Sequence, residues 1–323
     1  MKKASKLLIQ GLVIGGVLLT LAHAQAEKIV ATTTGSGNAI GWPFYVALKK
    51  GFFAKEDLTV DAVAASSSTA AVLQVTAGAA QVSADGALAD VMRAIDKGGP
   101  IAILRIGVQA PPFELLANPS IKNLKDLKGK TVSVGGAKDV TRLYLDRMLE
   151  SNGLKDSDVD LVYAGSSAAR LAALQSRAVH AAILTPPFNY LGVAAGFPVI
   201  GRTVDYVKDL PQSSTAVNRA WAAGHMDAAR SYLAAFNKSI DWLRDRRNRD
   251  EAIAILAEAG KLKPEEVAKS YDFFIGGDYF EPTGIVSKAK LRSVAKMLAS
   301  LGDVPAKVDI NAMVLPGVTK VGE

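Results

Sequence analysis

Residues 60–86 read VDAVAASSSTAAVLQVTAGAAQVSADG, and residues 159–185 read VDLVYAGSSAARLAALQSRAVHAAILT. Each stretch begins with a strand-like alternation, passes through a Ser-Ser pair, enters a helix of apolar periodicity and ends in a short apolar run. When the two are aligned without gaps, Ser67 matches Ser166 and Ala71 stands opposite Arg170. Two copies of a strand–helix–strand unit predict two similar α/β lobes, with a ligand held between matching helix N-termini.

The sequence around the two copies alternates in the same way. Further strands are expected at 29–32, 101–108, 131–134, 198–200 and 215–221, and further helices at 43–50, 88–95, 140–151 and in four segments after residue 225. Alternation of this kind favours mostly parallel sheets with helices on both faces. In such sheets the ligand site lies at the carboxyl ends of the strands.

Two polar or proline-rich segments, 111–128 and 202–214, are interpreted as crossings between the lobes. They predict hinges near Phe113–Ser120 and Leu210–Ser214. The expected domains are therefore lobe 1 in two parts and lobe 2 between them: 27–115 begins lobe 1, 116–212 forms lobe 2, and 213–323 returns to lobe 1 with a strand and the C-terminal helices.

The first 26 residues are typical of a secretory signal peptide. Three lysines precede an apolar run at 7–21, and Ala24-Gln25-Ala26 is a small-x-small cleavage site. We expect cleavage before Glu27, with the bond between Ala24 and Gln25 as the alternative; an uncleaved N-terminal anchor is the other interpretation. The chain has no cysteine, so disulfides and a lipid anchor are both excluded. A free periplasmic protein is the expected product.

Charge and motif content exclude several functional classes. The formal net charge of +7 includes three lysines of the predicted leader, and the other basic residues alternate with acidic ones. This pattern indicates a solvated mixed surface and no nucleic-acid partner. The segment GSGNAIG at 35–41 lacks the residues of a phosphate-binding loop and the spacing of a dinucleotide fingerprint. No Ser/His/Asp arrangement and no metal-spaced histidines occur, so we expect no catalytic residue, no metal and no cofactor.

Five segments of the chain resemble the NMT1/THI5-like periplasmic binding proteins, in their order as well as their content. They are GWPFYVALKKGFFAKEDLTVDAV (41–63), TAGAAQVSADG (76–86), IKNLKDLKGKTVSVGG (121–136), LESNGLKDSDVDLVYAG (149–165) and SIDWLRDRRNRDEAIAIL (239–256). Members of that family are solute receptors of ABC importers for nitrate, taurine, alkyl- and arylsulfonates and pyrimidine thiamin precursors. The resemblance implies a type II two-lobed periplasmic binding protein fold, α/β, that closes around its ligand. The eukaryotic pyrimidine synthases of this superfamily use a Cys-rich motif, which this chain lacks.

Thirteen residues are candidates for ligand binding. Most of them lie in loops after strands or at helix starts, and the two arginines could bind an anionic ligand. They are Thr33, Thr34, Ser36, Trp42, Ser67, Ser68, Asp85, Gly136, Thr141, Arg142, Ser166, Thr185 and Arg219. Hydroxyls and free N–H groups at helix N-termini bind anions, and arginine binds planar acids bidentately. Trp42 could stack on a ligand or wall the cleft, and Asp85 could bind a ligand ammonium. The plain structural interpretations are helix caps for the serines and Asp85, surface groups for the arginines and a rigid turn for Thr185.

The residues and the resemblance together indicate a solute-binding protein of an ABC importer. It would capture a small anionic solute, such as a sulfonate, nitrate or a carboxylate, and act as a monomer with an inner-membrane permease and its cytoplasmic ATPase. Three alternatives stay open: a binding protein that signals to a membrane receptor, a receptor for a pyrimidine or thiamin-precursor ligand, and a secreted enzyme on the same scaffold.

Overall fold

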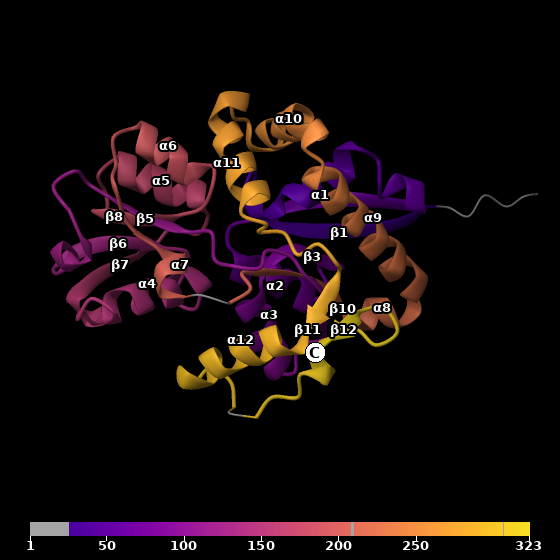
Figure 1. Ribbon diagram of the computed structural model, residues 1–323. Helices are drawn as coiled ribbons and strands as arrows, with labels where there is room; N and C mark the ends of the chain where they lie inside the picture. The colour runs from indigo at the N-terminus through magenta and orange to yellow at the C-terminus, as the bar shows by residue number, and fades with distance from the viewer. Residues whose placement is uncertain (1–25, 208–209, 306) are drawn as a thin grey trace, which may run out of the picture.

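The computed structural model describes residues 26–207, 210–305 and 307–323. The predicted signal peptide, apart from Ala26, lies outside the described residues. The described chain forms two lobes, each with a five-stranded sheet flanked by helices, as predicted (Figure 1). This is the periplasmic binding protein fold that the sequence resemblance implied.

The sheet of lobe 1 has the strand order β2-β1-β3-β10-β4. β1 runs parallel to β2 and β3, whereas β10 runs antiparallel to β3 and β4. The strands are β1 Glu27–Thr34, β2 Leu58–Ala65, β3 Val82–Ala87, β4 Ile101–Ile106 and β10 Ser213–Asn218. The helices between them are α1 Trp42–Lys49, α2 Ser68–Thr76 and α3 Leu88–Asp96.

The sheet of lobe 2 repeats this plan with the order β7-β6-β8-β5-β9. β6 runs parallel to β7 and β8, and β5 is the antiparallel strand between β8 and β9. The strands are β5 Glu114–Ala117, β6 Lys130–Val134, β7 Val159–Tyr163, β8 Ala181–Leu184 and β9 Val199–Arg202, and the helices are α4 Val140–Glu150, α5 Ser167–Gln175, α6 Phe188–Ala194 and α7 Thr203–Tyr206. The doubled sequence therefore becomes β2–α2–β3 in one lobe and β7–α5–β8 in the other, at equivalent places.

Two segments differ from the sequence-based expectation. The crossing expected at 111–128 contains strand β5, so the predicted boundary at 115/116 falls inside a strand of lobe 2. The strand expected at 215–221 ends at Asn218, whose side chain accepts a hydrogen bond of 3.0 Å from Trp221 N and so caps the next helix. Both differences concern short elements of four to six residues, which are too short to show a clear period.

The two connections between the lobes lie side by side. Gly107 N donates to Ser213 O at 2.8 Å, Gln212 N donates to Val108 O at 2.8 Å, and Val108 N donates to Ser213 Oγ at 3.0 Å. We therefore propose that the hinge lies at Gly107–Val108 and Gln212–Ser213, before the first hinge segment that the sequence predicted.

The C-terminal segment covers lobe 1, and α11 reaches across to α6 of lobe 2 (Figure 1). Its elements are α8 Arg219–Gly224, α9 Met226–Arg244, α10 Arg249–Gly260, α11 Pro264–Gly276, β11 Ile285–Ser287, α12 Lys288–Ser300 and β12 Lys320–Gly322. Short 3₁₀ turns occupy Ala39–Gly41, Ala54–Glu56, Leu124–Leu127, Asp156–Asp158, Arg246–Asn248 and Asn311–Met313. Among the described residues, no helix has the length and apolar character needed to cross a membrane.

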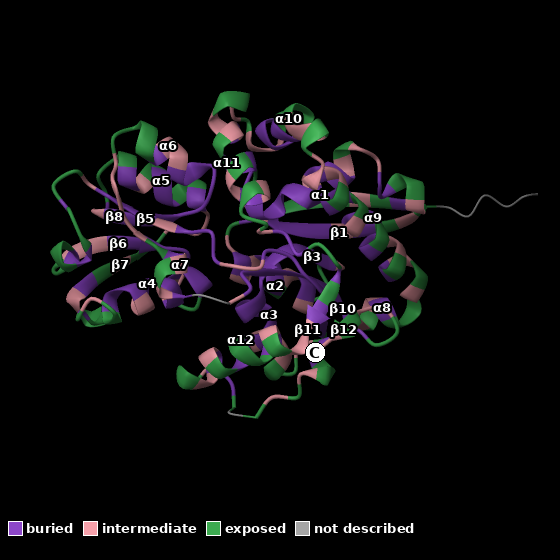
Figure 2. Cartoon of the chain, viewed as in Figure 1, coloured by how far each residue is buried: buried purple, intermediate pink, exposed green. Residues whose placement is uncertain are grey.

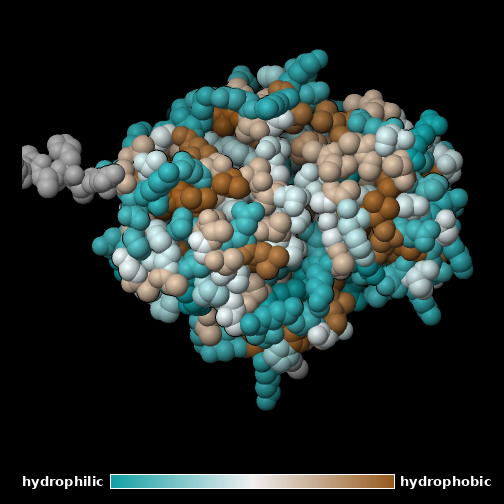
Figure 3. Space-filling view, turned by 180° about the vertical axis from the view of Figure 1, so that it is seen from behind, coloured by the Kyte–Doolittle hydropathy of each residue, from teal (hydrophilic) through white to brown (hydrophobic). Residues whose placement is uncertain are grey.

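The cores of both lobes lie between the sheets and their helices (Figure 2). Strands β4 and β8 are buried along their whole length, as expected for strands covered on both faces. On the face seen in Figure 3, hydrophobic residues lie scattered among hydrophilic ones, which is ordinary for a water-facing protein surface.

Candidate functional site

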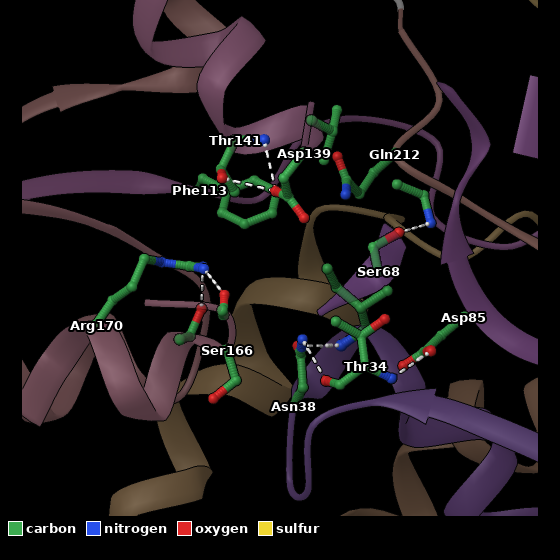
Figure 4. A pocket seen from close by; sticks show the side chains of 15 residues that line it. Thr34, Asn38, Ser68, Asp85, Phe113, Asp139, Thr141, Ser166, Arg170 and Gln212 are labelled. Carbon is green, nitrogen blue, oxygen red and sulfur yellow. Dashed lines mark hydrogen bonds between the residues drawn. The ribbon is translucent and has the colours of Figure 1, made fainter. Parts of the chain in front are cut away.

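A pocket lies at the interface of the two lobes, at the carboxyl ends of their parallel strands (Figure 4). It is lined by Thr34, Asn38, Ile40, Ser68, Asp85, Ala87, Phe113, Asp139, Val140, Thr141, Gly165, Ser166, Ser167, Arg170 and Gln212. About 30 Å³ is open to the centre of a water molecule, which is room for about two waters. The pocket as it stands therefore encloses a group of only a few atoms.

Four helices begin at this pocket, two from each lobe: α2 and α3 of lobe 1, and α4 and α5 of lobe 2. Ser67 caps α2 by accepting a bond of 3.1 Å from Ala70 N, and Ser166 caps α5 by accepting one of 3.3 Å from Ala169 N. Asp139 caps α4, and Ala87 stands at the N-cap of α3. Each helix N-terminus presents partial positive charge, so all four favour negative charge in the cavity.

Arg170 on α5 is the arginine that lines the pocket. Its Nε donates to Ile183 O at 2.7 Å, its Nη2 donates to Ser167 Oγ at 2.9 Å, and its Nη1 donates to Gly165 O. Burial lowers its pKa to about 10, which still leaves the guanidinium protonated at neutral pH. Its charge therefore acts on the pocket, although three of its N–H groups are held by the protein.

Two carboxylates line the same pocket, one from each lobe. Asp85 on β3 is 4% exposed, and its Oδ1 accepts a bond of 2.8 Å from Thr34 N. Asp139 of lobe 2 is 5% exposed, and its Oδ1 accepts bonds from Thr141 N at 2.9 Å and Thr141 Oγ1 at 2.7 Å. Burial raises the pKa of Asp85 to about 6, so this carboxyl is still mainly ionised above pH 7.

The lobes are in contact around the pocket. Ala39 N of lobe 1 donates to Pro186 O of lobe 2 at 3.2 Å, and Thr185 Oγ1 donates to Asn38 Oδ1 at 3.4 Å. On the other side, Arg93 Nη1 of α3 donates to Lys138 O of lobe 2 at 3.1 Å. These contacts enclose the cavity, so the structure is a closed form.

Five of the thirteen predicted residues line the pocket: Thr34, Ser68, Asp85, Thr141 and Ser166. Two others lie just behind its wall. Thr185 is fully buried with its Oγ1 3.0 Å from Ser167 Oγ, and Ser67 is the cap of α2 whose neighbour Ser68 faces the cavity.

The other six are placed elsewhere. Trp42 is fully buried in the core of lobe 1, where its Nε1 donates to Ala252 O at 2.9 Å, so it does not wall the cleft. Arg142 forms ion pairs with Asp146 at 2.8 Å and Asp156 at 2.6 Å, which draw it away from the cavity. The other four do not line the pocket: Thr33, which bonds Gly35 O; Ser36, which is exposed; Gly136, in the loop before α4; and Arg219, which holds the carbonyl oxygens of Ile101, Ala312 and Val314.

Several lining residues were not among the sequence-based candidates. The most informative are Asn38, Phe113, Asp139, Arg170 and Gln212. A signal existed for two of them. Arg170 stands opposite Ala71 when the copies are aligned, and Asp139 directly precedes the apolar run of α4 in the position of a cap. The others come from segments whose approach to the pocket depends on the packing of the two lobes.

Comparison with known proteins finds the same fold. A family model described as NMT1/THI5 like matches residues 39–249. A search of curated proteins finds no match. Among the described residues, no three His, Asp or Glu side chains are grouped so as to hold a metal ion.

Three solved structures illustrate the likeness. A protein from Bordetella bronchiseptica RB50 is 22% identical with a TM-score of 0.80, over 91% of this chain and 96% of that one. The periplasmic aliphatic sulphonate binding protein SsuA from Escherichia coli is 21% identical with a TM-score of 0.67, over 91% and 99%. The periplasmic nitrate-binding protein NrtA from Synechocystis PCC 6803 is 16% identical with a TM-score of 0.75, over 89% and 85%.

Proposed function

Since the chain belongs to the NMT1/THI5-like family, whose model matches residues 39–249, we propose that it is a periplasmic solute-binding protein of an ABC importer. It captures a small solute between its lobes and delivers it to an inner-membrane permease that a cytoplasmic ATPase drives. The observation that carries this proposal is the enclosed pocket, to which both lobes contribute helix N-termini and buried polar side chains. A site of this kind binds a small molecule and releases it when the lobes part.

An anionic group of the solute fits best at the start of α5. Ser166 caps that helix, and Arg170, one turn further along, supplies a full positive charge. Two of the three structurally similar proteins named above are an aliphatic sulphonate binding protein and a nitrate-binding protein. The small cavity favours a solute of few atoms over an arylsulfonate.

Closure follows from the contacts that only the closed form makes. A solute binds first to one lobe. When the hinge at Gly107–Val108 and Gln212–Ser213 closes, the solute also contacts side chains and N–H groups of the other lobe. The solute stabilises the closed form by the free energy of those added contacts alone. The permease would then bind the surface that the two closed lobes form together.

The test is a thermal-shift panel on the purified protein with nitrate, alkylsulfonates, taurine, small carboxylates and a pyrimidine thiamin precursor. A ligand at 100 times its Kd adds about 2.7 kcal/mol, which for about 300 residues raises Tm by about 4 °C. No shift with any solute of the panel would refute the proposal.

A pair of variants related by the sequence repeat locates the site. Ser67→Ala and Ser166→Ala each remove one N-cap and should each cost about 1 kcal/mol of stability. Only Ser166 lines the pocket, so only Ser166→Ala should weaken binding of the solute that shifts Tm most. Equal effects on affinity from both variants would contradict the assignment.

A further inference from the structure

Asp90 on α3 is a buried carboxylate at the contact between the two lobes. It is 5% exposed, and its Oδ2 accepts a bond of 3.3 Å from Thr69 Oγ1. Arg93 Nη1 donates to Asp90 Oδ1 at 3.0 Å and also to Lys138 O of lobe 2 at 3.1 Å. One nitrogen atom therefore links Asp90 to the backbone of the other lobe, and opening of the lobes would break that link.

Lobe 2 presents a second buried carboxylate at the same contact. Asp139 directly follows Lys138, is 5% exposed and accepts the N–H and the hydroxyl of Thr141, as Figure 4 shows. Burial and, after it, the charge of Asp139 raise the pKa of Asp90 to about 7. Closure therefore brings two nearly buried carboxylates from opposite lobes close enough to repel each other.

The nearby cations do not remove this repulsion. Arg93 also bonds Asp303, through Nε at 2.8 Å and Nη2 at 2.6 Å, so one guanidinium serves two carboxylates before lobe 2 adds a third. Lys97 and Lys138 are exposed, and within the described residues neither forms an ion pair with Asp90. The groups around Asp90 are the hydroxyls of Ser68 and Thr69 on α2, Arg93 and Lys97 of its own helix, Asp303 after α12, and Lys138, Asp139 and Tyr144 of lobe 2.

We propose that Asp90 and Asp139 form a proton-binding site that is complete only when the lobes close, so that solute capture takes up one proton. This rests on the function proposed above and adds a second ligand, the proton, to the solute. In the open form Asp139 moves away with lobe 2, and Asp90 ionises beside Arg93. In the closed form a proton on Asp90 removes both the repulsion and the cost of a buried charge. Low pH therefore favours closure and tight binding, and high pH favours opening and release.

Isothermal titration calorimetry with nitrate and methanesulfonate at pH 6 and pH 8 tests the inference, because both anions keep their charge across this range. If Asp90 ionises near pH 7 in the closed form and at its ordinary value in the open form, the probe should bind about 10-fold more tightly at pH 6 than at pH 8. At pH 6, two buffers of different ionisation enthalpy should reveal uptake of about one proton per solute.

Two aspartates of the same helix provide the variant and its control. Asp90→Asn should bind the probe equally at both pH values and take up no proton, because the amide does not ionise. Asp96→Asn, at an exposed position of α3, should keep the pH dependence of the unmodified protein. The comparison of buffers needs no variant, so it decides the question even if Asp90→Asn fails to fold.

Each contrary outcome has a definite meaning. Equal affinity at pH 6 and pH 8, or binding without proton uptake, would refute the proton site and leave the proposed transport function standing. A pH dependence that persists in Asp90→Asn and disappears in Asp85→Asn would assign the proton to the pocket and would equally overturn the inference. If neither anion binds, the same comparison is made with the solute of the panel that shifts Tm most. If no solute of the panel shifts Tm, the proposed function fails and the proton site fails with it.

Discussion

Closure of the two lobes depends on a glycine at their contact. Gly165 follows β7 of lobe 2 with a φ of +54°, and a Cβ at this position would lie 2.5 Å from the carbonyl oxygen of Ser66 in lobe 1. The oxygen belongs to the backbone, so it cannot rotate away as a side chain would. We predict that Gly165→Ala prevents full closure and weakens solute binding.

The structure sets the size of the effect. An ordinary Cβ contact begins at 3.4 Å, so the lobes must part locally by about 0.9 Å. The interlobe bonds from Ala39 N to Pro186 O at 3.2 Å and from Thr185 Oγ1 to Asn38 Oδ1 at 3.4 Å would then exceed hydrogen-bond length. Two lost bonds at about 0.5–1.5 kcal/mol each amount to about 1–3 kcal/mol, or roughly 5- to 150-fold in affinity.

A matched control separates this clash from backbone strain. Gly153 has a φ of +77° in the same lobe, and a Cβ there would meet nothing within 4 Å. Alanine at either position should cost about 1 kcal/mol of stability, because both positions are left-handed. This strain is the same in the open and closed forms, so it does not change the free energy of solute binding.

The assay is calorimetric affinity for the solute that gives the largest thermal shift, together with small-angle scattering at saturation. Gly165→Ala should bind more weakly and keep a larger radius of gyration, whereas Gly153→Ala should match the unmodified protein in both. An unchanged affinity for Gly165→Ala would refute the argument that this contact limits closure.

Three further predictions concern pH, packing and the arginines. Burial and the charge of Asp139 raise the pKa of Asp90 to about 7. Between about pH 4 and pH 7 the folded state therefore holds a proton that the unfolded state has released, so the free energy of unfolding declines as the pH rises through this range. Asp90→Asn should make Tm less dependent on pH between pH 5 and pH 8. Parallel Tm curves would contradict this. Trp42→Ala should lower the free energy of unfolding in urea by about 3–5 kcal/mol, because the buried indole loses its packing and its bond to Ala252 O; a loss below 1 kcal/mol would place Trp42 outside the core. Arg142→Ala should leave solute affinity within about twofold, since its ion pairs are partly exposed, whereas Arg170→Ala should abolish binding; the reverse order would restore Arg142 as the ligand partner.

The fold was largely predictable because its signals are local and repeated. The Ser-Ser pairs, the apolar helices after them and the short strands at the ends of both copies lie where the sequence indicated. Strand β5 was missed because its four residues, Glu114–Ala117, are too few to show a strand or a helix period. Its place between β8 and β9 is decided by pairing with distant segments.

The site was predictable only in part, because contacts between distant segments also decide which side chains reach the pocket. Ser67 and Ser166 could be recognised because capping depends on three neighbouring residues. Position along the chain does not separate Arg142 from Arg170, since both lie near the start of a helix in lobe 2, and the sequence signal for Arg170 was its contrast with Ala71 in the other copy. Asp146 and Asp156 hold the first at the surface, and the carbonyl oxygens of Gly165 and Ile183 hold the second at the cavity. These partners are set by tertiary packing and not by spacing along the chain.

The place of β10 between β3 and β4 has a consequence for the order of folding. Every strand of lobe 2 lies between residues 114 and 202, so its sheet can form from one continuous segment. Lobe 1 lacks an interior strand until Ser213–Asn218 has been synthesised, and β4 has no partner in that sheet before then. Because pairings between distant segments form late, lobe 2 should fold first. The N-terminal third of the chain then stays incompletely paired until about two thirds of the protein has been made.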